Sequence, residues 1–245
     1  MLAKLLFSLT LLTTPATLGA ARLCPAQEVA PLADGRMLGH LPYEEARPEQ
    51  LASAPAGFAI GGKCQLRREV VTDLERLLAA ANAMPELRGA IRAVSCHRSI
   101  ARQGQVFCGQ IGPRKKSRDA ADRARWVGPP GYSEHATGYA LDFGTRPSRG
   151  CRDVDPCFAR TAAGRWLLAH ATDYGFELSF PAGNAQGVSY EPWHWRWVGT
   201  SLAAPGASAA RTTFTRARAS YPAMPAVSDN PARLLSPAPG FNSLR

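Results

Sequence analysis

The hydrophobic positions of the chain predict two amphipathic helices and several short strands. Apolar residues recur every three or four positions between residues 67 and 83, and again between 161 and 174, with charged residues among them. Gly175 follows the second repeat and is expected to end that helix. Short, mostly alternating runs predict strands at residues 91–96, 138–144, 176–180 and 193–198. We therefore predict a single α+β domain, with an antiparallel β-sheet that packs both helices on one face and carries a cleft on the other.

The segments that flank this domain have a different composition. Residues 22–66 are rich in Pro, Ala and Gly, and we expect an extended N-terminal arm packed on the core of a catalytic domain at 67–202. Residues 109–132 are dominated by Gly, Pro and charge, which predicts a long exposed loop. From 203 to 245, large apolar residues are few, and such a segment cannot offset the entropy of its own ordering. We predict a mostly disordered tail there.

The first residues have the pattern of a secretory signal. Lys4 supplies a positive charge, residues 5–12 form a short apolar run, and residues 19–21 are small. The apolar run is much shorter than the roughly 20 residues of a membrane span. We predict a signal peptide at 1–21, no membrane span, and a mature protein exported to the periplasm or cell envelope.

Cysteine usage agrees with an oxidising compartment. An even number of cysteines without a close Cys-x-x-Cys pair favours disulfides over a zinc-cysteine site. The chain has six, at positions 24, 64, 96, 108, 151 and 157. Six cysteines allow fifteen pairings, so connectivity stays open. The closest pair, Cys151 with Cys157, is the first choice, and Cys96–Cys108 with Cys24–Cys64 would complete an orderly set.

The charge balance is basic, with 29 Lys and Arg against 19 Asp and Glu and a net charge of +10. A basic protein suggests a polyanionic partner. For an exported protein that partner would be the cell wall or the membrane surface rather than nucleic acid. The densest basic run, at residues 114–118, is also explained by a solvated loop without any partner. Nothing in the sequence fixes the oligomeric state.

One predicted strand combines a carboxylate with unusually small neighbours. On residues 138–144, Gly138 and Asp142 share a face with Ala140, while the bulky apolar residues point to the opposite face. His135 comes just before the strand, and Gly138 lets the chain turn it back toward Asp142. A structural His–Asp pair would explain these two residues equally well.

A second histidine segment favours a metal site. His194 lies on the polar face of the strand at 193–198, and Glu191 precedes it by three residues. Two histidines (135 and 194) with Asp142 are ligands that Zn²⁺ accepts, and three protein ligands leave a fourth position for water. A zinc ion lowers the pKa of that water to about 7. Glu191 is then a candidate general base.

These segments resemble the signatures of the VanY-type zinc D-alanyl-D-alanine carboxypeptidases. The resemblance is carried by Ser-x-His-x-x-Gly-x-Ala-x-Asp, from Ser133 to Asp142, and by Glu-Pro-Trp-His, from Glu191 to His194. It implies a Hedgehog/DD-peptidase-like fold, one zinc ion on His135, Asp142 and His194, and Glu191 as catalytic base. It also implies a peptidoglycan stem peptide as substrate.

The resemblance extends to three further residues. Arg98 matches an arginine that stabilises the developing oxyanion, Ser133 a serine that holds the substrate carboxylate, and Gln103 a glutamine that lines the pocket. The chain departs from the family at residues 96–97, where Cys-His replaces Gly-Tyr. This departure concerns the wall of the substrate pocket and not the metal ligands.

Other functions remain compatible with these residues. A D,D- or L,D-endopeptidase or a dipeptidase could use the same scaffold. A non-catalytic module that binds zinc or peptidoglycan is a second alternative, but such a module has no use for Glu191 beside the metal. A 2-His-1-carboxylate iron oxygenase has the same ligand set; however, its carboxylate usually follows the first histidine by two residues, and here the interval is seven.

Overall fold

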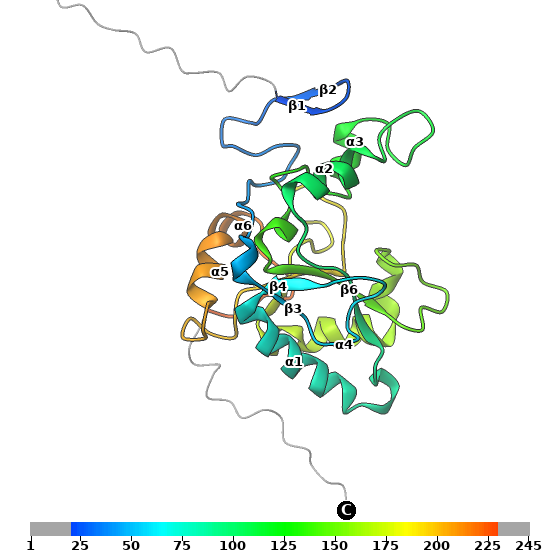
Figure 1. The fold of residues 1–245 in the computed structure, drawn as a ribbon, viewed down its shortest axis with the longest axis vertical. Helices are drawn as coiled ribbons and strands as arrows, with labels where there is room; N and C mark the ends of the chain where they lie inside the picture. Colours follow the sequence, from blue (N-terminus) through cyan, green and yellow to red (C-terminus); the bar gives the residue numbers. More distant parts are fainter. Residues whose placement is uncertain (1–20, 230–245) are drawn as a thin grey trace, which may run out of the picture.

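The computed structural model describes residues 21–229 and has a four-stranded antiparallel sheet at its centre (Figure 1). Strand β6 pairs with β5 on one side and with β8 on the other, and β8 pairs with β7. The strands are β5 (Ile91–Ser95), β6 (Ala140–Thr145), β7 (Phe176–Leu178) and β8 (His194–Trp197). The predicted α+β fold with an antiparallel sheet is confirmed.

Two helices cover one face of this sheet, as predicted. They are α1 (Arg68–Asn82) and α4 (Ala162–His170), which lie below the sheet in Figure 1. Leu74 of α1 and Leu167 of α4 are fully buried in the same cluster as Phe143 and Trp195 of the sheet. The chain leaves α4 through Gly175, whose φ of +80° is a left-handed conformation that glycine adopts without strain.

The opposite side of the sheet carries two helices that the hydrophobic pattern did not predict. Helix α2 (Ile100–Cys108) starts at Ser99, whose hydroxyl caps it by accepting from the Arg102 amide. Helix α3 (Ala120–Ala124) interrupts the stretch expected to be a long loop. Within residues 21–229, five 3₁₀ turns connect the elements: η1 (Pro48–Gln50), η2 (Pro85–Leu87), η3 (Glu134–Thr137), η4 (Pro156–Arg160) and η5 (Ala171–Tyr174). No helix in the described part of the chain is long and apolar enough to cross a bilayer.

The N-terminal arm contains two small hairpins. One pairs β1 (Ala21–Cys24) with β2 (Gln27–Val29), and the other pairs β3 (Leu51–Ser53) with β4 (Gln65–Arg67). Phe58 and Leu66 of the second region are buried in the main core.

The C-terminal segment corrects the expectation of a disordered tail. Residues 203–229 are described, and they include α5 (Ala207–Thr213) and α6 (Thr215–Ser220). Phe214, between the helices, is fully buried in the main core, and Arg211 donates to the carbonyls of Val198 and Gly199. One large apolar anchor and several small alanines bury enough surface to order the segment. Residues 230–245 and the predicted signal sequence up to residue 20 lie outside the described residues.

The disulfides correct two of the three predicted pairings. Cys151 pairs with Cys157 as expected, but Cys24 pairs with Cys108 and Cys64 with Cys96. The reason is α2, which carries Cys108 away from the end of β5 and toward β1. Cys64 instead lies beside Cys96, because the chain after Cys96 bonds back to the strand after Cys64: the His97 amide donates to the Gln65 carbonyl.

Candidate metal centre

Two neighbouring strands and one turn bring the three predicted ligands together. Asp142 of β6 and His194 of β8 are direct partners in the antiparallel register, so their side chains lie on the same face. His135 sits in η3, and Gly138, at φ +73°, ends that turn and leads into β6. A side chain at Gly138 would meet Leu51 at 2.9 Å. Ligand atoms of His135, Asp142 and His194 all lie within 4.8 Å of one another, and all three residues are buried.

The distances fit a small cation. Asp142 Oδ2 is 3.2 Å from His135 Nε2, and Asp142 Oδ1 is 2.9 Å from His194 Nδ1. Ligands about 2.1 Å from a tetrahedral Zn²⁺ are roughly 3.4 Å apart. The site therefore matches zinc in ligand type and in spacing.

Hydrogen bonds on the far sides of the two imidazoles select the nitrogens that face the cation position. His135 Nδ1 is 2.8 Å from the Cys96 carbonyl, to which it donates, so Nε2 is left as the free donor to a metal. His194 Nε2 is 3.0 Å from Glu134 Oε2, so its Nδ1 is left free. Metal-binding histidines usually have such an outer partner, which fixes the tautomer and the ring orientation.

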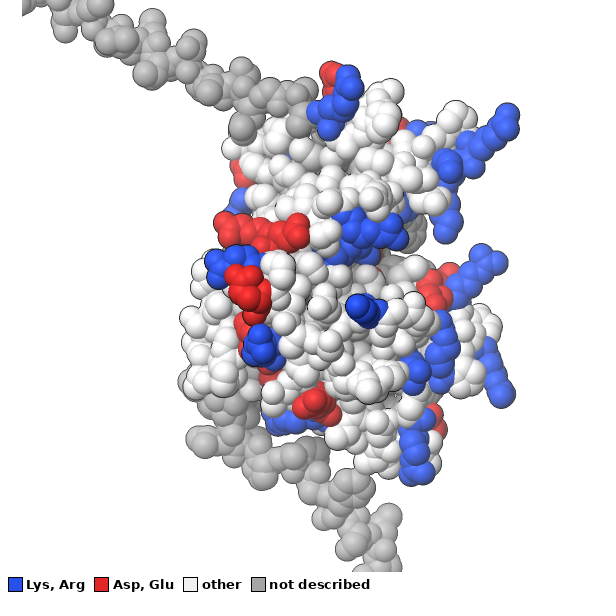
Figure 2. All heavy atoms as spheres, in the orientation of Figure 1, with Lys and Arg blue, Asp and Glu red and all other residues white. Residues whose placement is uncertain are grey.

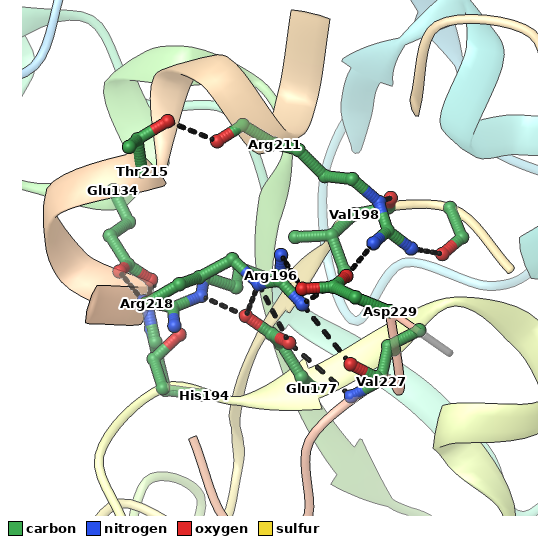
Figure 3. A network of polar contacts seen from close by, with 12 residues as sticks. Glu134, Glu177, His194, Arg196, Val198, Arg211, Thr215, Arg218, Val227 and Asp229 are labelled. Atoms are coloured by element: carbon green, nitrogen blue, oxygen red, sulfur yellow. Dashed lines mark hydrogen bonds and ion pairs between the residues drawn. The ribbon is translucent and has the colours of Figure 1, made fainter. Parts of the chain in front are cut away.

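Glu134 is the residue that sequence reasoning missed. It is 4% exposed and, besides His194, accepts from Arg196 Nη1 at 2.9 Å and from Ser179 Oγ at 2.6 Å. Arg196 in turn donates to Glu177, which also binds Arg218 of α6. Figure 3 shows this chain of charges running from His194 to the C-terminal segment. A usable signal existed, because the pattern placed Arg196 on the same strand face as His194, where a buried arginine requires a carboxylate.

Charge and burial oppose one another within the site. Burial disfavours the ionised forms of Asp142 and Glu134, but neighbouring positive groups outweigh it. The two imidazoles hold the pKa of Asp142 well below its usual range. Arg196 and His194 do the same for the pKa of Glu134. Burial lowers the pKa of His135 to about 4. At His194 burial acts in the same direction, yet hydrogen bonds to the two carboxylates raise its pKa to about 10. The site thus attracts positive charge.

The three predicted ligands line a cleft of about 480 Å³. Glu191 and Ser133 line it, 5% and 6% exposed, and neither side chain hydrogen-bonds to another residue of the described chain. Burial raises the pKa of Glu191 to about 8, and nearby carboxylates add to the shift while His194 opposes it. Both side chains are therefore available to a bound molecule.

The far wall of the cleft comes from the basic segment between α2 and η3. Its residues and a loop around Pro156 line the same cleft as the predicted metal ligands. This wall contributes Lys116, Ser117, Arg123, Trp126, Val127 and Gly128. Figure 2 shows Lys and Arg side chains along the right-hand edge of the molecule, where Asp and Glu are fewer.

Arg98 lines the cleft, but Gln103 does not. Arg98 donates from Nε to Gln103 Oε1 and from Nη1 to Ser95 Oγ at 2.9 Å. Gln103 is fully buried, and its amide nitrogen donates to the Gly128 carbonyl. Gln103 is therefore not among the residues that line the cleft, and its role in substrate binding stays a prediction. Gln103 lies behind Arg98 and orients it, because α2 turns the glutamine inward.

A buried His–Asp–His group beside a free carboxylate in a cleft defines a candidate metallohydrolase site. The chain belongs to the VanY family: residues 63–200 match the family model for D-alanyl-D-alanine carboxypeptidase. The resemblance seen in the sequence motifs is confirmed.

Known proteins support this membership. The chain is 32% identical over 164 residues to the putative carboxypeptidase YodJ of Bacillus subtilis. This match covers 64% of this chain and 56% of YodJ. It is 32% identical over 136 residues, 55% of its length, to the bifunctional D-Ala-D-Ala dipeptidase and carboxypeptidase VanXYC of Enterococcus gallinarum, of which the match covers 67%. The solved structure of the LdcB LD-carboxypeptidase is similar with a TM-score of 0.54 and 30% identity, over 72% of this chain and 77% of that one.

Proposed function

We propose that this protein is an exported zinc carboxypeptidase that removes D-alanine from peptidoglycan stem peptides. The observation that carries the proposal is the convergence of His135, Asp142 and His194 in a cleft that also exposes the carboxylate of Glu191. The wider function is supported by the family and by relatives that act on D-Ala-D-Ala. Export is supported by the signal-like residues 1–21 and by the three disulfides.

The chain's own residues suffice for peptide hydrolysis around such an ion. A zinc ion, when bound, supplies a water of lowered pKa and polarises the scissile carbonyl. Glu191 accepts the proton of the attacking water as the new C–O bond forms, and returns it to the nitrogen as the C–N bond breaks. Arg98 donates hydrogen bonds to the carbonyl oxygen as negative charge develops there. Ser133 holds the substrate carboxylate.

The LdcB similarity raises a second candidate, an L,D-carboxypeptidase, because LdcB is an LD-carboxypeptidase. An L,D-carboxypeptidase releases a terminal D-residue from an L-centre, whereas a D,D-carboxypeptidase releases it from another D-residue. We use a stem tetrapeptide to offer the first bond and a pentapeptide to offer the second. Both reactions use the same residues and release D-alanine.

One experiment tests the proposal and separates the two candidates. Purified protein is incubated with pentapeptide and tetrapeptide muropeptides, with and without a chelator, and the products are identified by mass spectrometry. We expect D-alanine release that is lost with chelator and in Glu191→Gln, but kept in Glu75→Gln, a control on exposed Glu75 of α1. Metal analysis is expected to find zinc. Tight peptide binding without any release would indicate a binding module, and iron in place of zinc would refute the metal assignment.

A further inference from the structure

Arg123 of α3 is a buried cation inside the cleft without a partner of opposite charge. The residue is 8% exposed and lines the cleft together with the three metal ligands. Its Nη2 donates to the Val106 carbonyl at 3.1 Å, but its Nε has no hydrogen-bond partner. None of the ion pairs found between residues 21 and 229 involves Arg123.

No carboxylate among the described residues that line the cleft forms an ion pair with Arg123. Glu134 and Asp142 are already occupied by Arg196 and by the two histidines. Asp155 accepts from the Cys157 amide, and Glu191 is the carboxylate assigned to the reaction. Arg98, another cation of the cleft, also lacks an ion pair within the described chain and repels Arg123. Burial, and then Arg98, lower the pKa of Arg123.

Such an arrangement is unfavourable unless something binds there. A buried charge needs a partner, and an uncompensated one destabilises the fold. A guanidinium pairs best with a planar anion such as a carboxylate, which can accept two parallel hydrogen bonds. The substrate of a carboxypeptidase carries a carboxylate into this cleft, whereas an internal peptide bond carries none.

We propose that Arg123, in addition to Ser133, binds a carboxylate of the peptide substrate in this cleft. This inference rests on the proposed function and names what the enzyme recognises. Two carboxylates of a stem peptide could occupy the position: the C-terminal one, or a side-chain carboxylate at the third residue, as in diaminopimelate. The chemistry is the same in both cases, and the substrates of the test distinguish them.

The test uses four peptides that differ only in these carboxylates. Two end in a free carboxylate and two in an amide, and within each pair the third residue is diaminopimelate or lysine. Turnover (kcat and KM) and calorimetric binding are measured for the wild type, for Arg123→Gln and Arg123→Lys, and for the control Arg125→Gln. Arg125 is exposed on the same segment and lies outside the cleft. Thermal unfolding checks that each variant is folded.

We expect Arg123→Gln to weaken binding and raise KM by about 10- to 100-fold for peptides that carry the recognised carboxylate, the range for a charged hydrogen bond. Peptides without that carboxylate should be unaffected, and Arg123→Lys should restore part of the loss. If binding weakens only for the peptides with a free C-terminus, Arg123 binds the terminal carboxylate. If it weakens only for the diaminopimelate peptides, Arg123 binds the side-chain carboxylate of the third residue. Equal effects on all four peptides, or no effect, would overturn the inference. If the wild type hydrolyses none of the peptides, the proposed function fails, while calorimetry still decides the role of Arg123.

Discussion

Glu134 is expected to control metal affinity through His194, and replacing it gives a quantitative test. Glu134→Ala removes the acceptor for His194 Nε2, so the ring is free to rotate and to change tautomer. Loss of such an outer partner typically weakens metal binding about 10- to 100-fold. The same change removes one of the two carboxylates that bind Arg196.

Glu177→Ala is the matched control. Glu177 is 1% exposed and accepts from Arg196 Nε at 2.8 Å, but it makes no hydrogen bond to His194. Removing one partner of a buried ion pair costs about 3–5 kcal/mol. Arg196 keeps one carboxylate partner in either variant, so we expect both variants to lose folding free energy near the lower end of this range. For a chain of this size, about 3 kcal/mol lowers Tm by roughly 6–12 °C.

Two measurements separate the effects. Zinc affinity is determined by competition with a chromophoric chelator, and the stability of the metal-free protein by thermal unfolding. We expect similar losses of Tm in Glu134→Ala and Glu177→Ala, but weakened zinc binding in the first variant alone. If Glu134→Ala binds zinc as tightly as Glu177→Ala does, the carboxylate does not orient His194 and our account of the site is wrong.

Three further predictions concern the frame of the site. Removing the Cys24–Cys108 disulfide, which closes an 84-residue separation, should lower the free energy of unfolding in denaturant by about 4 kcal/mol; an unchanged midpoint would contradict this. Phe214→Ala should cost about 3–5 kcal/mol in the same assay, because the ring is fully buried, whereas a tail that does not pack would tolerate the change. Burial lowers the pKa of His40 below the usual value for histidine, about 6.5. Below that pH the unfolded chain takes up a proton that the folded chain resists, so stability falls. The Tm of His40→Gln should therefore fall less between pH 7 and pH 5 than that of the wild type. Equal decreases in Tm would show that the lowered pKa of His40 does not contribute to this loss of stability.

The proximity of two candidate ligands, Asp142 and His194, was predictable because strand alternation determines which side chains share a face. Alternation along the strand places Asp142 on the face opposite to Tyr139, Leu141 and Phe143, and the structure buries those three residues in the core. The same rule placed His194 away from the tryptophans of β8. Alternation worked for these two residues because both strands are central in the sheet, whereas His135, in the turn before β6, was assigned through the family motif.

The supporting residues could not be found in the same way. The C-terminal helices rely on small alanines around Phe214, and such residues give little hydrophobic signal before their packing partner is known. Helix α2 is short, and its unpredicted course changed the partner of Cys108. Arg123 lies in a run of charges that is also typical of a solvated loop, and only the fold shows that its side chain is buried.

Cys96 has a further consequence for when the enzyme becomes competent. Its sulfur is bonded to Cys64, and its carbonyl accepts the proton of His135 Nδ1. Formation of the Cys64–Cys96 disulfide therefore helps to fix the carbonyl that orients the His135 ring. A chain in a reducing compartment would lack this tether, so reduction of the Cys64–Cys96 bond is expected to loosen the position of the His135 ring.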